Sequence, residues 1–199
     1  MVEIHRRVSD NYVGIWTMKH LIGLSGYAQS GKDTAAAVLR EVGYERIAFA
    51  DTLRSAVYAL NPLMPDGRRV QDVVDEMGWD RAKVNFTEIR TLLQKMGTEV
   101  GRNLLGENIW VDTALAGLDQ SRKYVVTDCR FPNEADAIRS RGGIVLRIAR
   151  TGVTKANDHP SETSLDNYDF DGILVNDGTV EDFHDEIKAK YYDDFKSRV

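Results

Sequence analysis

The segment Leu21–Thr34 holds the residues whose types and spacing point most closely to one chemistry. It reads LIGLSGYAQSGKDT and contains the spacing G-x-x-x-x-G-K from Gly26 to Lys32. Glycines at these positions let successive backbone N–H groups face one concavity, and the lysine reaches the β and γ phosphates of a nucleotide. A chance glycine-rich turn is the alternative. The strand expected before the loop and the helix expected after it, over Ala35–Leu39, favour a phosphate-binding loop.

The position after the lysine departs from the usual pattern. A serine or threonine that ligates magnesium is typical there, whereas this chain has Asp33, with Thr34 following. Asp33 could reach the metal directly or through water, or it could cap the helix while Thr34 holds a phosphate, and the sequence leaves both open. Magnesium is expected in either case because phosphoryl transfer requires the phosphate charge to be neutralised.

A second polar group follows the apolar run that ends at Thr127. Asp128 comes first, Arg130 two residues later, and Glu134 one helical turn further on. In α/β sheets, ligands collect at the carboxyl ends of strands. An aspartate there can orient a substrate or hold the water of a magnesium ion, and the arginine can offer two parallel N–H groups to a phosphate. The alternative is a helix-capping aspartate beside a surface arginine.

Other polar candidates carry weaker signals. Arg90, Gln94 and Thr98 recur at a spacing of four, so they share one face of an expected helix, and spacing alone favours a solvent-exposed face. Trp110 could stack on a base, although a tryptophan is more often part of a core. Cys129 is expected to be a small packing residue.

Further candidates lie within or after the fourth and fifth apolar runs. Arg147 and Arg150 could clamp phosphates. Asn176 opens the sequence Asn-Asp-Gly, where an adenine could rest on the backbone, but such a turn signal is common. His159 in the loop beyond Arg150 resembles a metal site superficially, because two carboxylates flank it at Asp158 and Glu162.

These residues need an α/β framework to position them. Five short apolar runs are typical of strands buried in a parallel sheet: 21–25, 46–49, 124–127, 144–148 and 172–175. The segments between them predict helices, with right-handed crossovers. Asp51 is expected to cap a helix over 52–60, and Thr87 a helix from 88 to about 105. Pro132 is expected to begin a helix over 132–141 that ends before Gly142. Thr179 and Asp182 predict a capping box at the start of the last helix.

Composition bounds the class of protein. The 199 residues include 42% hydrophobic and 29% charged residues, as expected of roughly one globular domain. A lone cysteine excludes an internal disulfide framework and fits a reducing cytosol. No apolar run approaches a membrane span or a signal peptide. The net charge of −5 argues weakly against a general nucleic-acid binder, although the acidic residues are concentrated after residue 156.

Taken together, the motifs resemble those of the phage-type deoxynucleoside monophosphate kinases of the P-loop kinase superfamily. The resemblance runs from about Lys19 to Ile187 and rests on several motifs in the right order. They are Gly26–Thr34 in its G-K-D-T form, Phe49–Leu53, Leu92–Thr98, Trp110-Val111, Thr127–Glu134, Gly142-Gly143, Arg147–Arg150 and Val175–Gly178. Several ordered motifs are far more specific than the loop alone.

The resemblance implies a three-layer fold with a five-stranded parallel sheet, a helical insert at about 51–118 and a lid loop at about 150–171. The kinase domain would span 18–199, with 1–17 as an N-terminal extension. The implied reaction moves the γ-phosphoryl of ATP, with Mg²⁺, to a deoxynucleoside monophosphate in the synthesis of dNTP precursors. It also implies a cytoplasmic protein, in the host if the source is a bacteriophage, and allows a homodimer. No nucleic acid or membrane partner is expected.

The resemblance further implies roles for individual residues. Lys32, Asp128, Arg130 and Arg150 would be catalytic, with Arg150 closing over the transferred group. ATP would contact Ala28, Gln29, Gly31, Lys32, Asp33, Thr34 and Asn176. The acceptor would contact Arg90, Gln94, Thr98, Trp110, Asp128, Arg130 and Glu134, and Asp33 would be the candidate metal ligand.

Two other functions fit some of the same residues. A P-loop kinase of another small metabolite, such as dephospho-coenzyme A, shares the loop and the lid. A nucleotide-binding regulatory module would bind without an acceptor, and a guanine-specific switch would usually carry N-K-x-D, which does not occur here. At Tyr27 to Gln29, some relatives are expected to carry basic residues. Base preference and oligomeric state stay open.

Overall fold

The computed structural model describes residues 19–155 and 160–190, which divide between two compact units. The sheet unit contains the described residues up to Ile47 and from Leu118 onward, and the helical unit is Ala48–Gly117. The extension predicted at 1–17 and a part of the predicted lid lie outside the described residues, as do Asp158 and His159. No helix in the described ranges is long and apolar enough to cross a membrane.

The sheet unit is built on five parallel strands, as predicted. They are β1 (Leu21–Ser25), β2 (Tyr44–Ile47), β3 (Lys123–Val126), β4 (Ile144–Ala149) and β5 (Gly172–Val175), in the order β2-β3-β1-β4-β5. All four neighbouring pairs are parallel. The β1 strand is central, so the phosphate-binding loop that follows it emerges from the middle of the carboxyl edge.

One predicted strand is misplaced. The apolar run 46–49 predicted a strand there, but β2 ends at Ile47, Ala48 caps the next helix and Phe49 begins it. As an edge strand, β2 has partly exposed residues and so carries Glu45, which hides the first half of the strand in the sequence. The apolar run instead joins the end of the strand to the buried start of the helix.

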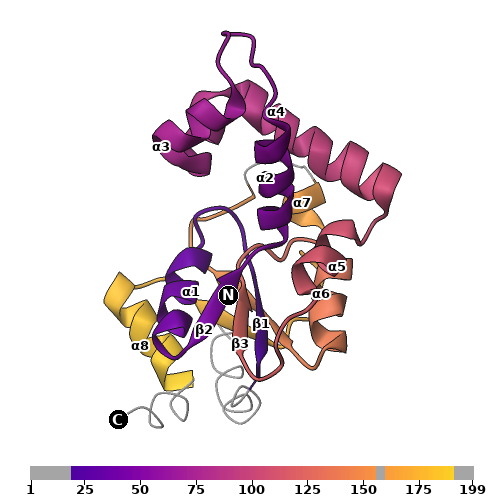
Figure 1. Cartoon of the computed structure of the whole chain (residues 1–199). Helices are drawn as coiled ribbons and strands as arrows, with labels where there is room; N and C mark the ends of the chain where they lie inside the picture. Colours follow the sequence, from indigo (N-terminus) through magenta and orange to yellow (C-terminus); the bar gives the residue numbers. More distant parts are fainter. Residues whose placement is uncertain (1–18, 156–159, 191–199) are drawn as a thin grey trace. The chain divides into compact units, whose positions relative to one another are not determined.

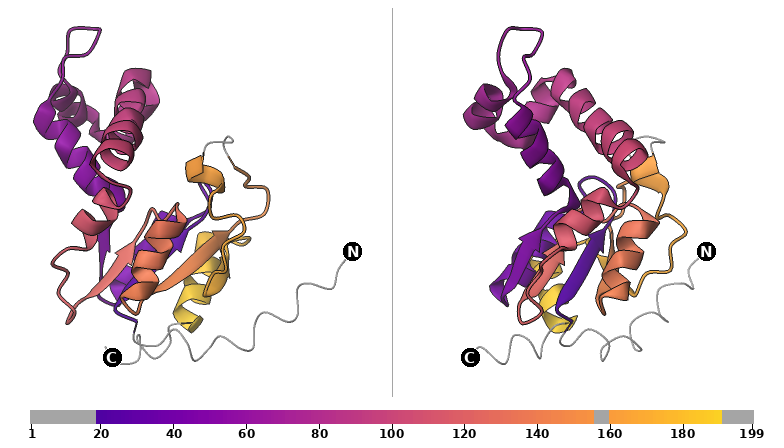
Figure 2. Two further views of the ribbon diagram at one scale, coloured as in Figure 1. Left: turned by 90° about the vertical axis from the view of Figure 1, so that its right-hand side faces the viewer. Right: turned by 45° about the vertical axis from the view of Figure 1, so that its right-hand side comes forward.

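Helices cover both faces of the sheet and give it three layers. The α1 helix (Lys32–Glu41) and the α8 helix (Val180–Lys190) pack together on one face, and α6 (Pro132–Ser140) covers the other (Figures 1 and 2). The α6 helix approaches β1 closely because Gly23 has no side chain: a Cβ there would lie 2.6 Å from Ile138 Cδ1. A short helix, α7 (Pro160–Thr163), lies in the loop before β5.

Two helix starts in the sheet unit follow the predicted chemistry. Pro132 is the first residue of α6, and the carboxylate of Glu134 accepts backbone N–H groups from Arg130 at 2.6 Å and Phe131 at 3.1 Å. Before α8, the Thr179 N–H donates to Asp182 Oδ2 at 2.8 Å. The Asp182 N–H donates back to Thr179 Oγ1 at 3.1 Å, which confirms the capping box.

The helical unit contains α2 (Phe49–Leu60), α3 (Val70–Asn85), α4 (Thr87–Lys95), a π-helix η1 (Met96–Leu105) and α5 (Ile109–Leu115). Its core includes Val57, Val73 and Ile89. Two predicted caps are wrong. Asp51 lies in the first turn of α2, which starts earlier than predicted, and Thr87 is the first residue of α4, with no capping bond from its side chain.

The continuous helix predicted from Glu88 to about Leu105 changes type at Met96. Its second half, η1, winds as a π-helix. The indole of Trp110 packs directly on Gly101, where any side chain would overlap the ring, and its Nε1 donates to Gly97 O at 2.8 Å. Gly97 and Gly101 on η1 therefore leave room for the indole of Trp110. The hydrophobic periodicity of the sequence does not indicate this packing.

Candidate nucleotide-binding site

The loop between β1 and α1 has the backbone that its glycines predicted. Gly26 and Gly31 have φ angles of +152° and +108°, and Gln29 adopts +64°. A Cβ at Gly26 would lie 2.6 Å from Ile148 O, and one at Gly31 would overlap Asn176 Nδ2. Both glycines are therefore required for conformation and for close approach. The loop opens directly onto the N-terminus of α1, whose free N–H groups favour an anion.

Lys32 is the first residue of α1 and folds back over the loop. Its Nζ donates to Gly26 O and Tyr27 O, at 2.7 Å each. Burial lowers the pKa of Lys32 to about 8, and the positive charge of Arg130 adds to this effect. Desolvation and a neighbouring cation both disfavour the ammonium form. Asp33 and Glu162 offset only part of this effect, and a bound phosphate would add further negative charge beside the ammonium.

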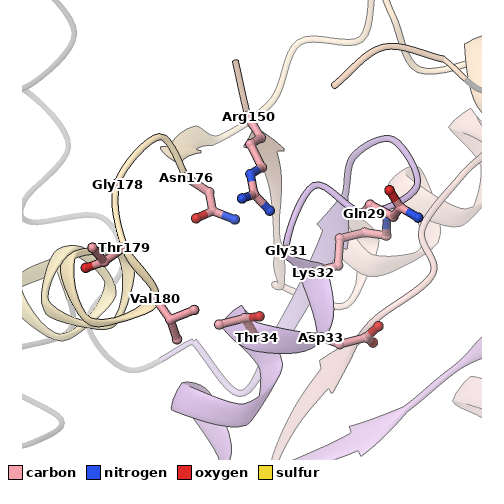
Figure 3. A pocket seen from close by; sticks show the side chains of 10 residues that line it. All are labelled: Gln29, Gly31, Lys32, Asp33, Thr34, Arg150, Asn176, Gly178, Thr179 and Val180. Carbon is pink, nitrogen blue, oxygen red and sulfur yellow. The ribbon is translucent and has the colours of Figure 1, made fainter. Parts of the chain in front are cut away.

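A pocket of about 460 Å³ lies beside the loop. This volume is within the usual range for small-molecule sites. Figure 3 shows the guanidinium of Arg150 and the amide of Asn176 pointing toward the loop at Gly31. The lining residues are Gln29, Gly31, Lys32, Asp33, Thr34, Arg150, Asn176, Gly178, Thr179 and Val180. The structure therefore brings together every residue predicted to contact ATP except Ala28, which is exposed and does not line the pocket.

Asn176, the residue directly after β5, supports the loop. Its side chain is buried, and Nδ2 donates to Ser30 O at 2.8 Å across 146 residues of sequence. Ser30 is also buried, and its Oγ has no hydrogen-bond partner in the described part of the chain. Since unpaired buried hydroxyls are costly, this loop fits an incoming polar group such as a phosphate oxygen.

The first turn of α1 supplies oxygen atoms suited to magnesium. Asp33 and Thr34 both line the pocket, and Figure 3 shows their side chains pointing to opposite sides of that turn. Residues 19–155 and 160–190 contain no cluster of three or more potential metal ligands. Magnesium at nucleotide sites typically takes one or two protein oxygens together with phosphates and water. The residues present therefore fit a metal held mainly by the nucleotide.

The residues that follow β3 form a second group in the sheet unit. Asp128 and Arg130 are half-buried, whereas Glu134 is buried and its carboxylate anchors the start of α6. Arg130 Nη1 lies 2.6 Å from Oε1 of Glu162, which comes from α7. None of these four lines the pocket. Arg130 and Glu162 are nevertheless close enough to affect Lys32 electrostatically: the arginine lowers the pKa of Lys32 and the glutamate raises it.

A third cluster ties the loop to the segment after α7. Tyr27 OH donates to Asp166 Oδ1 at 2.8 Å, a bond that raises the pKa of the phenol. Arg147 of β4, paired in register with Ser25, places its guanidinium 4.6 Å from the centre of the Tyr27 ring and 3.4 Å from Asp166. Arg147 thus holds Tyr27 of the phosphate-binding loop in place through its stacking on the ring and its ion pair with Asp166.

The remaining predicted acceptor residues belong to the helical unit. Arg90 and Gln94 are exposed on α4, and Thr98 is exposed on η1. Trp110 is different, because the residue is 7% exposed and its Nε1 donates to the backbone carbonyl of Gly97. Its indole belongs to the packing of the helical unit, so stacking on a base stays a prediction.

Comparison with known proteins decides the family. The sequence model of deoxynucleotide monophosphate kinase matches residues 68–187, more than half of the chain. A putative deoxynucleotide monophosphate kinase of Acanthamoeba polyphaga mimivirus is 31% identical over 191 residues, covering 84% of this chain and 93% of the relative. The chain belongs to the deoxynucleotide monophosphate kinase family. The resemblance inferred from the motifs is confirmed.

Other relatives of this kinase are matched over different shares of their length. The deoxynucleotide monophosphate kinase of Enterobacteria phage T4 is 33% identical over 105 residues, which cover 50% of this chain and 44% of the phage protein. Among solved structures, dephospho-CoA kinase from Campylobacter jejuni matches 85% of this chain and 94% of its own, at 14% identity and a TM-score of 0.42.

The family match and the loop are separate observations. The matched range 68–187 contains Asp128, Arg130, Arg150 and Asn176, whereas the phosphate-binding loop lies outside it. Sequence reasoning overlooked the contributions of Tyr27 and Asp166, and it considered Glu162 only as part of a loop cluster. Their partners lie far along the chain, and no local spacing signals such contacts.

Proposed function

We propose that this kinase moves the γ-phosphoryl of ATP to a deoxynucleoside monophosphate and releases the diphosphate. Family membership over residues 68–187 carries the proposal. The phosphate-binding loop supports it independently. Two glycines with positive φ, the half-buried Lys32 and the N-terminus of α1 lie together outside the matched range. A kinase domain at 18–199, an insert at about 51–118 and a lid at about 150–171 are parts of the same proposal.

The donor side of the proposal uses the pocket beside the loop. The backbone N–H groups of Gln29 and Gly31 and the ammonium of Lys32 hold the phosphates of ATP, and Ala28 is a proposed contact outside the pocket lining. Asn176 keeps the loop in shape through Ser30 O. Arg150, which points to the loop, neutralises charge on the transferred group.

Magnesium is part of the proposal, with Asp33 or Thr34 as its protein ligand. When bound, it neutralises charge on the phosphates. Both residues line the pocket and offer oxygen atoms. Asp33 is exposed and replaces the usual hydroxyl residue. Measuring the Mg²⁺ dependence of activity in Asp33→Asn and in Thr34→Val separates the two assignments.

On the acceptor side, Arg130 takes the phosphate of the monophosphate and Asp128 orients the acceptor near it. Glu134 holds the backbone of Arg130 in place and so acts through that residue. Arg90, Gln94, Thr98 and Trp110 are proposed contacts of the acceptor in the helical unit. The first three are exposed, which suits a ligand contact.

Catalysis then needs alignment more than covalent chemistry. Phosphoryl transfer passes through a loose transition state whose charge spreads over the equatorial oxygens, so fixed cations are the main requirement. Lys32, Arg130 and Arg150 supply them. No nucleophile of the protein is used, because a phosphate oxygen of the acceptor attacks the γ-phosphorus and ADP leaves.

A coupled assay of ADP release tests this function. It uses dGMP, dTMP, dCMP and dAMP as acceptors, with dephospho-coenzyme A and no acceptor as comparisons. Release that requires at least one of the four monophosphates supports the proposal. Release with dephospho-coenzyme A alone indicates the metabolite kinase, and slow acceptor-independent hydrolysis indicates a regulatory module. Gel filtration tests the homodimer, and the cytoplasmic location stays a part of the proposal.

A further inference from the structure

The geometry of the contact between Arg130 and Glu162 is suited to holding a catalytic arginine in place. Nη1 of Arg130 lies 2.6 Å from Oε1 of Glu162, a short charge-assisted hydrogen bond between residues 32 positions apart. The side chain of Glu162 is 10% exposed, whereas that of Arg130 is 38% exposed. The carboxylate is therefore covered, and the guanidinium that it holds still presents surface to solvent.

The segment that carries Glu162 is itself held in place. Ser164 N donates to Pro160 O at 2.9 Å within α7, and Leu165 is buried. Asp166 then accepts from the Tyr27 hydroxyl at 2.8 Å and pairs with Arg147. Two contacts reach the phosphate-binding loop and β4, so the backbone on the C-terminal side of Glu162 is anchored independently of Arg130.

Charges of both signs act on Lys32. Arg130 and Arg147 both lower the pKa of Lys32, while Asp33 and Glu162 raise it. Three cations thus face the same small region. A carboxylate held against Arg130 offsets part of their mutual repulsion and restricts the rotamers of the arginine. A guanidinium is planar, so a bond at Nη1 also sets the plane in which its other N–H groups point.

We propose that Glu162 is a positioning residue, which fixes the guanidinium of Arg130 for the phosphate of the acceptor through the Nη1–Oε1 contact. The inference rests on the proposed kinase function and extends it to the segment after β4. Glu162 does not touch the substrate. It lowers the cost of ordering a long, flexible side chain at the moment of binding and transfer.

A mutant cycle tests this role. We compare wild type, Glu162→Ala, Arg130→Ala and the double variant, measuring kcat and KM for ATP and for the monophosphate that wild type uses best. Glu162→Gln keeps the shape and an oxygen acceptor, and covers the case in which the alanine variant fails to fold. Glu41→Gln is the control, since it removes the charge of an exposed carboxylate of α1 that pairs with Lys188 of α8 at 3.5 Å. Thermal unfolding reports folding for each variant.

The expected loss for Glu162→Ala is about 10- to 100-fold in kcat/KM for the acceptor, with KM for ATP changed less than about twofold. Glu162→Gln should lose less than the alanine variant. In the Arg130→Ala background, removing Glu162 should cost much less in kcat/KM for the acceptor than it costs in wild type, because its effect on the acceptor acts through that arginine. Glu41→Gln should match wild type.

Three results would overturn the inference. Additive losses in the double variant would show that Glu162 works without Arg130. Tighter acceptor binding by Glu162→Ala would show that the carboxylate competes with the phosphate. Unchanged kinetics in both Glu162 variants would leave the contact without a role. A wild-type protein inactive with all four monophosphates would instead refute the proposed function itself, so the two failures are distinct.

Discussion

The lowered pKa of Lys32 makes nucleotide binding depend on pH in a defined direction. Burial is the main cause, and it brings the pKa to about 8 in the free protein. Bound phosphates stabilise the ammonium, so the pKa of Lys32 rises in the complex. By linkage, affinity for ATP is fully present below the free-protein pKa and is lost as the pH rises through about 8.

The size of the effect follows from the fraction of charged lysine. With a pKa of about 8, roughly three quarters of Lys32 is charged at about pH 7.5 and roughly one tenth at about pH 9. If the ammonium form binds, the Kd for ATP increases about eightfold between these values. Phosphate groups, with a second pKa of about 6, are already ionised across this window.

Isothermal titration calorimetry measures both the affinity and the protons taken up. Repeating the titration at about pH 9 in two buffers of different ionisation enthalpy should reveal uptake of close to one proton per ATP. Lys32→Arg keeps its charge throughout, so its Kd should be flat over the same range. A wild-type Kd that is also flat, with no proton uptake, would refute the assignment of Lys32 as the phosphate ligand with a depressed pKa.

Three further substitutions probe contacts that the structure defines. Asn176→Ala removes the bond to Ser30 O and should destabilise the protein by about 1–2 kcal/mol while weakening ATP binding, as measured by thermal unfolding and by calorimetry. Glu134→Gln weakens two backbone bonds at the start of α6 and should cost about 1–3 kcal/mol in urea unfolding, with a raised KM for the acceptor. Trp110→Phe keeps an aromatic ring but loses the Nε1 bond to Gly97 O, and should cost about 1 kcal/mol in the same urea assay.

Each of these substitutions has an outcome that contradicts the account. Full ATP affinity in Asn176→Ala would mean that the loop keeps its conformation without the hydrogen bond from Asn176 to Ser30 O. A neutral Glu134→Gln would show that the buried carboxylate does not hold α6. If Trp110→Phe leaves stability intact but abolishes acceptor use, the indole binds the acceptor rather than the backbone of η1.

The predictable part of the fold is the part governed by local sequence. The central strand β1 and the strand β5 were placed correctly because continuous apolar runs mark them. The capping box before α8 was recognised because its two partners are three residues apart. The edge strand β2 starts two residues before the predicted strand, since the polar Glu45 interrupts the apolar pattern after Tyr44.

What could not be predicted depends on distant contacts. The change from α4 to η1 at Met96 occurs in the segment where Trp110 packs on Gly101, and neither residue signals the other in sequence. The α3 helix was overlooked, and it contains a non-helical Gly78 with φ of +76°.

In the candidate site, too, the locally encoded residues could be predicted and the long-range contacts could not. Its loop residues were readable from spacing, because a strand, a glycine-rich turn and a lysine follow one another. The bond between Tyr27 and Asp166 joins residues 139 positions apart. The partnership of Arg130 with Glu162 is likewise long-range. A single sequence offers no pattern for such pairs, so the support of the catalytic groups required the structure.

The central claim is that this chain phosphorylates a deoxynucleoside monophosphate, and direct identification of the product tests it. ATP labelled at the γ-phosphate is incubated with wild type and each of the four monophosphates, and the nucleotides are separated by anion exchange. The account predicts label in a deoxynucleoside diphosphate for at least one acceptor, and almost none with the Lys32→Ala variant at equal folded concentration. Label in inorganic phosphate alone, or equal transfer by Lys32→Ala, would contradict it.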